Sequence, residues 1–517
     1  ALRIPLRRPA RLNLATETPS MSIRPESLLS VLSGPADFAG APFGADLLVF
    51  TKALKARGGA GLYVARDEKQ AAAAHRLAEF VAPALDRVML PGWDILPYDR
   101  VSPSPGIAAR RCAGLARLAA HDGAPLMIVT TASSLVQRVP PVETLRAASL
   151  TIEVGKPVDE RDLTDFLSVN GYIRVSTVHE RGEFAIRGGI IDIYPPTSAE
   201  PLRLDLFGDT LESLRAFDPD TQRSTGEVRS AALAPVSEIL FSDEVLTRFR
   251  EAYLARFGPP SGDPMYEAAR ASIRRQGMEG WLPLFHPRMD TLFDYLGEGA
   301  LIGLAPLAQE AASDRLAQAQ DYHDARIEAA GDARTARTLP PEALHLHPDE
   351  LARCLASRPV VRFQAGTPTD VSGDLGGRPG RDFAPERQRP DINIFEAAAD
   401  HARTCRDSGQ PVLFAAWSEG SVERLRHVLA DHGLPEADRA FSLEAARAAG
   451  LAVAELPLEQ GFELDDLTVL AEPDLLGDRL AAPRRKRKAA NFIAEASTLS
   501  AGRSEERSCR ERVSFTV

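Results

Sequence analysis

The stretch "RGEFAIRGGIIDIYPPTSAEPLRLDLFGD", Arg181–Asp209, decides the fold of the middle of the chain. Apolar and polar residues alternate in it with the two-residue period of a β-strand, and "PPTSAE" has the residue types of a turn between strands. In the second run, alternation points Leu202, Leu204 and Leu206 to a core and Arg203, Asp205 and Phe207 away from it. The pattern predicts a small antiparallel sheet with one buried face.

The first run carries an arginine and a Gly-Gly pair inside what reads as a single strand. Alternation there predicts one face made of Phe184, Ile186, Ile190 and Tyr194, and an opposite face made of Arg187, Gly189, Ile191 and Ile193. The glycines fit a bulge or a close approach by another backbone.

An arginine and an aromatic residue on the solvent side of a sheet are residue types enriched where proteins bind one another. The alternative is a surface ion pair between Arg203 and a carboxylate, with Phe207 partly covered by a neighbouring element. The pattern alone favours this alternative, because exposed ion pairs and single exposed apolar residues are common. The residues by themselves leave both interpretations open.

Length and charge limit the class of protein. The 517 residues, 44% of them hydrophobic, are enough for about three or four domains, and no apolar run approaches the ~20 residues of a membrane helix, so we expect a soluble chain. The net charge is −11, but residues 1–20 and 483–517 carry +3 and +5, which leaves −19 on the remainder. A body this acidic has no general attraction for nucleic acid.

Residues that could carry chemistry are few. The loop "GAPFGADLLVF" has Gly40 and Gly44 at positions typical of a phosphate loop, but it lacks the lysine that such a loop needs. The acidic pair Asp67-Glu68 is interpreted as a helix start rather than a metal ligand pair. The sequence therefore predicts no catalytic constellation.

Metal and disulfide sites are not predicted either. The histidines of "HLH", His345 and His347, would share a strand face but have no third ligand at suitable spacing. Four widely separated cysteines (Cys112, Cys354, Cys405 and Cys509) indicate free thiols in a reducing cytoplasm.

Four segments occur in an order that resembles the N-terminal half of the bacterial transcription-repair coupling factor (Mfd) family. They are "WDILPYDRVSPSPGIAARR" from Trp93, "RGEFAIRGGIIDIYPPTSAEPLRLDLFGDTLESLRAFDPDTQRS" from Arg181, "GWLPLF" from Gly280 and "DLLGDRL" from Asp474. The resemblance runs from about Met21 to about Gly502.

The resemblance implies an α/β multidomain fold. A degenerate UvrB-like, helicase-like α/β domain would be interrupted by a small antiparallel α+β UvrA-binding domain and followed by a second small α/β domain. The expected segments are a leader (1–20), the helicase-like domain in two parts (21–148 and 234–364), the UvrA-binding domain (149–233), a linker (365–391), the third domain (392–480) and a basic, aberrant C-terminal segment (481–517).

The same resemblance implies a partner and its contacts. The UvrA-contacting arginines and aromatic residue of the family fall on Arg187, Arg203 and Phe207, and the loop around Gly40 and Gly44 would be a vestigial phosphate site. The expectation is a non-catalytic module that recruits UvrA in nucleotide excision repair in the bacterial cytoplasm. A UvrB-like ATPase or helicase acting on damaged DNA is the alternative.

The resemblance also implies what this chain lacks. In the family, ATP and Mg²⁺, RNA polymerase and double-stranded DNA are bound by domains that follow the matched region, and the far end masks the UvrA-binding surface. We therefore expect constitutive UvrA binding, no cofactor, no metal and no membrane contact here. The basic run 484–488 is interpreted as a solvated face, with a contact to DNA or polymerase as the alternative.

Overall fold

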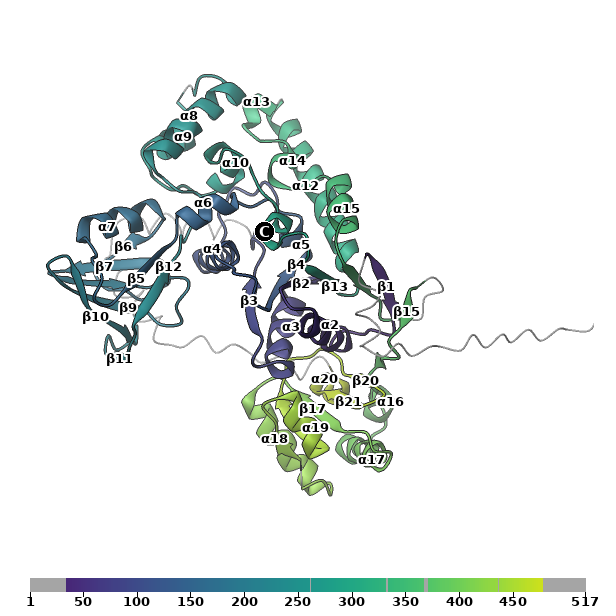
Figure 1. Cartoon of the computed structure of the whole chain (residues 1–517). Helices are drawn as coiled ribbons and strands as arrows, with labels where there is room; N and C mark the ends of the chain where they lie inside the picture. Colours follow the sequence, from purple (N-terminus) through teal and green to yellow (C-terminus); the bar gives the residue numbers. More distant parts are fainter. Residues whose placement is uncertain (1–33, 261, 332, 367–370, 436, 478–517) are drawn as a thin grey trace, which may run out of the picture.

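The structure is a computed structural model that describes residues 34–477, apart from 261, 332, 367–370 and 436. The leader 1–20 and the segment 481–517, including Cys509 and the basic run, lie outside the described residues. Figure 1 shows a central α/β unit, which we call the body, with one domain projecting to its side and another below it.

The body is built on a seven-stranded sheet in which every neighbouring pair is parallel. Its order is β15 (Gly373–Asp374), β1 (Ala36–Ala39), β14 (Val360–Phe363), β13 (Leu301–Leu304), β2 (Ala60–Ala65), β4 (Leu126–Thr131) and β3 (Asp86–Leu90). The helices α2 (Ala45–Arg57), α3 (Glu68–Val81) and α4 (Pro105–Ala119) connect its first strands. The central strands are buried along their whole length, as parallel strands covered on both faces are.

The projecting domain is an insertion in the body. Strands β1 to β4 come from the chain before residue 132 and β13 to β15 from the chain after residue 300, yet they form one sheet. The predicted interrupted α/β fold is therefore confirmed.

Residues 67 and 68 begin helix α3. The Asp67 side chain accepts a hydrogen bond from the Gln70 backbone N–H at 2.9 Å, which is the usual role of an N-cap aspartate. The Glu68 carboxylate accepts from the Gly92 backbone N–H at 3.0 Å. The interpretation of this acidic pair as a helix start is confirmed.

The inserted domain is mostly antiparallel. Its six-stranded sheet has the order β11 (Ser224–Glu227), β10 (Thr210–Phe217), β9 (Leu202–Phe207), β8 (Ile190–Ile193), β7 (Glu183–Arg187) and β6 (Ile173–Arg174). Helix α7 (Glu160–Val169) and a two-stranded sheet of β5 (Leu150–Glu153) and β12 (Ser230–Leu233) complete it. The three leucines of β9 face its core as predicted, with Leu202 and Leu204 buried and Leu206 packed against them.

The expected single strand through Arg187 is wrong. The chain turns at Gly188 and Gly189 and forms a hairpin in which Arg187 pairs with Ile190 and Ile186 pairs with Ile191. Opposed residues share a face, so Ile191 and Ile193 lie in the core with Phe184, and Ile190 lies beside Arg187. The close backbone approach is confirmed at Gly189, where a Cβ would lie 3.0 Å from the Leu206 carbonyl oxygen.

A helical region with its own aromatic core follows the inserted domain. Phe249 stacks on Phe285 with ring centroids 4.6 Å apart, and Tyr253, Tyr266 and Trp281 surround them. Its helices are α8 (Asp243–Phe257), α9 (Pro264–Arg270), the 3₁₀ turn Met278–Trp281 and α10 (Leu282–Phe285). The remaining helices around the body are α5 (Ala132–Leu135), α6 (Val142–Ala147), α11 (Leu292–Leu296), α12 (Ala308–Ala330), α13 (Ala333–Ala336), α14 (Pro341–Leu344) and α15 (Pro348–Ala356).

The third domain is a six-stranded mixed sheet. Its order is β16 (Arg378–Pro379), β20 (Phe462–Leu464), β21 (Leu467–Ala471), β17 (Val412–Ala416), β19 (Leu451–Glu455) and β18 (Asp438–Arg439). Its helices are α16 (Ala384–Arg387), α17 (Ile394–Asp407), α18 (Glu419–Asp431), α19 (Leu443–Ala449) and α20 (Glu472–Leu476).

One hydrophobic core joins the third domain to the body. Buried residues of β19, β20 and β21 belong to the same contiguous cluster as those of α2, α3 and β2. The Arg76 Nη2 of α3 lies 2.9 Å from the Glu455 carboxylate, and Lys69 pairs with Glu459. The two units therefore share buried surface rather than being joined only by a connecting segment.

Candidate functional site

The outward face of the inserted sheet carries charged side chains of both signs. Cross-strand pairing places Asp192 of β8 opposite Arg203 of β9, and Arg203 opposite Arg215 of β10. Arg187 pairs with Ile190, which pairs with Asp205 in the next row of the same face. We call this set of side chains, together with Phe207, the outer face.

Arg187 lies at one edge of the outer face and is exposed. Its Nη2 donates to the Thr177 hydroxyl at 2.9 Å and to the Ser176 carbonyl, both in the segment after β6. These bonds use one nitrogen of the guanidinium, so the other edge of the fork is available to solvent or to a partner.

Arg203 is held much more firmly. Its Nε and Nη2 donate to the two Asp192 carboxylate oxygens at 2.7 and 2.9 Å, and its Nη1 donates to the Gln222 carbonyl at 3.3 Å. The guanidinium also lies over the Phe217 ring, 4.7 Å from its centroid. The hydrogen bond that Arg203 donates to Asp192 raises the pKa of Arg203 above its usual value. The Arg203 fork is thus already occupied by a carboxylate of its own domain.

Phe207 is the most exposed large apolar residue of the described chain, with 79% of its surface accessible. It is the last residue of β9, and the turn at Gly208 and Asp209 follows it. Alternation correctly predicted that Phe207 points away from the core. The alternative interpretation expects a neighbouring element to cover part of Phe207. No such element is found among the described residues around Phe207.

The side chain of Asp46 lies against the loop between β1 and α2, which the sequence predicts to be a vestigial phosphate loop. Asp46, fully buried in the first turn of α2, accepts hydrogen bonds from the Gly44 and Leu47 backbone N–H groups at 2.8 and 2.6 Å. The Tyr63 hydroxyl donates to its other oxygen at 2.7 Å, and burial raises the pKa of Asp46 to about 7. The N–H groups that would cradle an anion are thereby used internally.

The third domain covers the same loop. The ring of Phe462 on β20 packs against Gly44, which has φ +101°, in the space that a Cβ at Gly44 would need. At the other glycine, Gly377 donates its N–H to the Gly40 carbonyl at 2.9 Å. Both glycines of the predicted vestigial loop are therefore packed against the chain that follows the body.

Comparisons with known proteins match both the inserted domain and most of the chain. The family model described as "UvrB interaction domain" matches residues 150–239. The chain is 30% identical to the transcription-repair-coupling factor of Haemophilus influenzae over 461 residues, which is 87% of this chain and 39% of that protein. It is also 30% identical to that of Escherichia coli over 424 residues and 26% identical to that of Bacillus subtilis over 418 residues, covering 79% and 75% of this chain.

Over most of its length, the chain is similar to the transcription-repair-coupling factors. The predicted resemblance is thus confirmed, and the chain spans about two fifths of the length of the curated relatives it matches. The UvrB interaction domain coincides with the inserted domain that carries the outer face.

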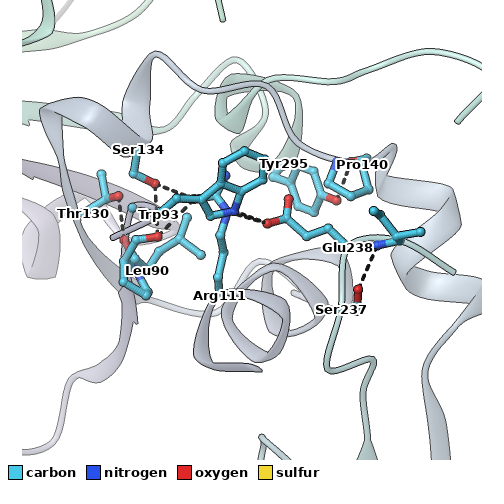
Figure 2. Close-up of polar contacts among 12 residues, drawn as sticks. Leu90, Trp93, Arg111, Thr130, Ser134, Pro140, Ser237, Glu238 and Tyr295 are labelled. Atoms are coloured by element: carbon cyan, nitrogen blue, oxygen red, sulfur yellow. Dashed lines mark hydrogen bonds and ion pairs between the residues drawn. The ribbon is translucent and has the colours of Figure 1, made fainter. Parts of the chain in front are cut away.

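A buried junction that the sequence reasoning missed fixes the UvrB interaction domain to the body. Arg111 of α4 is fully buried, and its Nε lies 2.9 Å from Oε1 of Glu238, which follows β12 at the end of the matched residues 150–239. The Trp93 indole N–H donates to the same oxygen at 2.8 Å, and Arg111 Nη1 donates to Ser134 Oγ at 2.8 Å. Figure 2 shows Trp93, Ser134 and Glu238 converging on the Arg111 guanidinium.

This junction gives a physical reason for one of the segments that carried the resemblance. Trp93 and Arg111 are the first and last residues of "WDILPYDRVSPSPGIAARR", and both bind one carboxylate oxygen. The sequence offered one signal for this junction, which was an arginine at a helix position that faces the sheet. A buried arginine requires a partner, so such an arginine indicates a buried ion pair.

The two histidines of the "HLH" segment do not share a strand face. His345 makes an isolated bridge with Gln137 and is buried, which lowers its pKa to about 4, whereas His347 is exposed and caps α15. Within the described residues there is no group of three or more His, Cys, Asp or Glu that could hold a metal, and no helix long and apolar enough to cross a bilayer.

Proposed function

We propose that this chain acts in transcription-coupled nucleotide excision repair as a protein-binding module that recruits UvrA. The single observation that carries the proposal is the exposure of Phe207 on the sheet face that also carries Arg187, two strands away, in a domain that matches the UvrB interaction domain. An unburied aromatic side chain and an arginine with unused donors on one face are residue types enriched in interface hot spots.

The three predicted contact residues have different roles in this proposal. Phe207 would enter an apolar pocket on UvrA, and Arg187 would pair with a UvrA carboxylate through the free edge of its fork. Arg203 cannot offer its fork to a partner while it binds Asp192. Its contribution would come from the remaining guanidinium surface, held in a fixed orientation by Asp192.

We further propose that the chain binds no nucleotide at the loop around Gly40 and Gly44. Asp46 occupies the backbone donors, Phe462 fills the adjacent space and no lysine is present to contact phosphate. ATP- and Mg²⁺-dependent movement on double-stranded DNA, and contact with RNA polymerase, are assigned to the part of the relatives that this chain does not match. ATP hydrolysis by the purified chain, with or without duplex DNA, would instead support a UvrB-like ATPase.

Titration of labelled chain with purified UvrA tests the recruitment proposal. We expect Phe207→Ala and Arg187→Ala each to weaken binding at least tenfold, because interface hot spots cost about 2 kcal/mol or more. Ile173→Ala and Arg174→Ala are matched controls, since both residues are exposed on β6 at the opposite end of β7. Equal affinity of all four variants would show that the outer face is not the UvrA site.

A further inference from the structure

A cleft of about 610 Å³ lies at the junction between the body and the UvrB interaction domain. One wall consists of residues of α3, β3 and α4, and the other of residues of β5, β12 and the segment at 196–197. In Figure 1 this is the boundary where α4 and β3 face β12. We call it the junction cleft.

The junction cleft is lined by basic side chains in an otherwise acidic chain. Its ionisable lining residues are His75, Arg87, Arg110 and Arg117, and none of the described residues that line it is an aspartate or glutamate. The chain as a whole has a net charge of −11. Two of the three arginines pair with Glu79 and Asp86 beside the cleft, and the positive charge of Arg110, which has no such partner in the described structure, favours an anion there.

Several hydrogen-bond donors of the junction cleft have no partner in the described structure. The Arg87 Nε–H is buried without one, and so is His75 Nδ1, which donates or accepts according to its tautomer. The hydrogen bond found for the Arg110 guanidinium joins its Nε to the Gly106 carbonyl of its own helix, at 3.2 Å. Buried polar groups normally have partners, so a ligand that supplies an acceptor would satisfy the Arg87 Nε–H.

The other two arginines are fixed in position by the body. Arg87 donates through Nη1 to the carbonyls of Ala82 and Leu85 at 3.3 and 3.0 Å, and Arg117 pairs with Asp86. On the opposite wall, Ser149 and Thr197 already donate their hydroxyls to the carbonyls of Leu145 and Ala232, and Thr151 adds a hydroxyl for which no such bond is found among the described residues. The cleft thus presents arginine donors from the body and the Thr151 hydroxyl from the inserted domain.

We propose that the junction cleft binds the phosphate group of a compact ligand, free or esterified. A phosphate has only acceptor oxygens, which suits a wall of donors, and arginine pairs with it through two parallel hydrogen bonds. The volume lies within the range of small-molecule sites, which occur preferentially at domain interfaces.

Two features favour a compact ligand over a polymer. The carboxylates of Glu79 and Asp86, which pair with Arg87 and Arg117, are exposed beside the cleft and would repel a continuing phosphate backbone. Nucleic-acid binding also requires several neutralised phosphates, and only Arg110 among the three arginines has no carboxylate partner in the described structure.

Such a ligand would act on the position of the UvrB interaction domain. Arg110 is the sequence neighbour of Arg111, which binds Glu238 at the buried junction. A phosphate that contacts both walls would hold the two domains at one separation, since it gains its full set of bonds only there.

The test uses the whole chain with inorganic phosphate, pyrophosphate and ribose 5-phosphate as probes, each titrated by calorimetry in a phosphate-free buffer. We expect at least one probe to bind and to raise the Tm, and Arg110→Gln to weaken that binding at least tenfold. Arg161→Gln, at an exposed arginine of α7, is the matched control and should leave the affinity unchanged.

Three outcomes would overturn the proposal. They are no binding by any of the three probes, equal binding by wild type and Arg110→Gln, and displacement of the bound probe by a duplex DNA oligonucleotide with higher affinity. The first two exclude this anion site, and the third identifies nucleic acid as its occupant. The UvrA titration is independent of all three, because Phe207 and Arg187 do not line the cleft.

Discussion

Arg203 and Asp192 meet across neighbouring strands through two hydrogen bonds, in which Nε and Nη2 reach the two carboxylate oxygens at 2.7 and 2.9 Å. Asp192 is only 3% exposed, so its carboxylate has little contact with water, and Arg203 is the charged side chain with which it pairs. Arg203, which is expected to contact a partner, therefore also stabilises its own domain.

The first prediction concerns that stability. Arg203→Ala leaves a buried carboxylate unpaired, and we expect a loss of about 3 kcal/mol in the free energy of unfolding of the UvrB interaction domain. Chemical denaturation of the chain measures it, with Arg174→Ala as the exposed control. Adding Asp192→Asn to Arg203→Ala should recover part of the loss, since the buried charge is then removed. An Arg203→Ala variant as stable as wild type would contradict the paired arrangement.

The junction supplies the second prediction. Glu238→Gln removes the charge that balances the fully buried Arg111, and we expect the free energy of unfolding to fall by about 3 kcal/mol. Trp93→Phe, which removes only one neutral donor to the same oxygen, should cost about 1 kcal/mol. Equal effects of the two substitutions, measured by urea denaturation, would show that the ion pair is not the dominant interaction.

The third prediction is a dependence of stability on pH. Burial raises the pKa of Asp46 to about 7, so the folded chain binds a proton there that the unfolded chain has released at an ordinary carboxyl pKa near 4. The stabilising contribution is complete below about pH 4 and is lost as pH rises to about 7, by at most about 1.4 kcal/mol per pH unit.

The matched variant is Asp46→Asn, which cannot ionise but keeps an oxygen for the Gly44 and Leu47 N–H groups. The difference in stability between wild type and variant should therefore shift in favour of the variant between pH 5 and pH 8. Urea denaturation at several pH values measures it. A difference that stays constant over this range would show that Asp46 does not titrate there.

The fourth prediction tests the contact between the third domain and the loop around Gly44. Gly44→Ala places a methyl group against the Phe462 ring at a backbone φ of +101°, and we expect a loss of at least about 1 kcal/mol. In a Phe462→Ala background the clash is absent, so the same substitution should cost less. Additive effects of the two substitutions in a double-mutant cycle would mean that the residues do not touch.

Periodicity was sufficient for much of the fold. A fully apolar run of strand length such as that of β4 is typical of a parallel strand covered on both faces. The alternating leucines of β9 correctly placed Arg203 and Phe207 on the solvent side. Periodicity failed at Gly188 and Gly189. A two-residue turn does not interrupt the apparent alternation along the sequence, but each residue after it lies on the face opposite to the one that a continuous strand would give.

The candidate site was predictable only in part, for a different reason. Which carboxylate Arg203 binds depends on the register between β8 and β9, and a one-residue shift would remove Asp192 from its side. The Arg111–Glu238 pair joins residues 127 positions apart, so no local pattern could reveal it. The packing of Phe462 on Gly44 is likewise a contact between domains that are distant in sequence.

The insertion of the UvrB interaction domain between β4 and β13 has a mechanical consequence. A domain joined to its body by two chain connections, with Glu238 anchored on Arg111 beside one of them, cannot rotate freely about a single hinge. A force applied to the outer face by a bound partner would therefore be transmitted through both connections to the central sheet. The domain would move together with the body rather than independently of it.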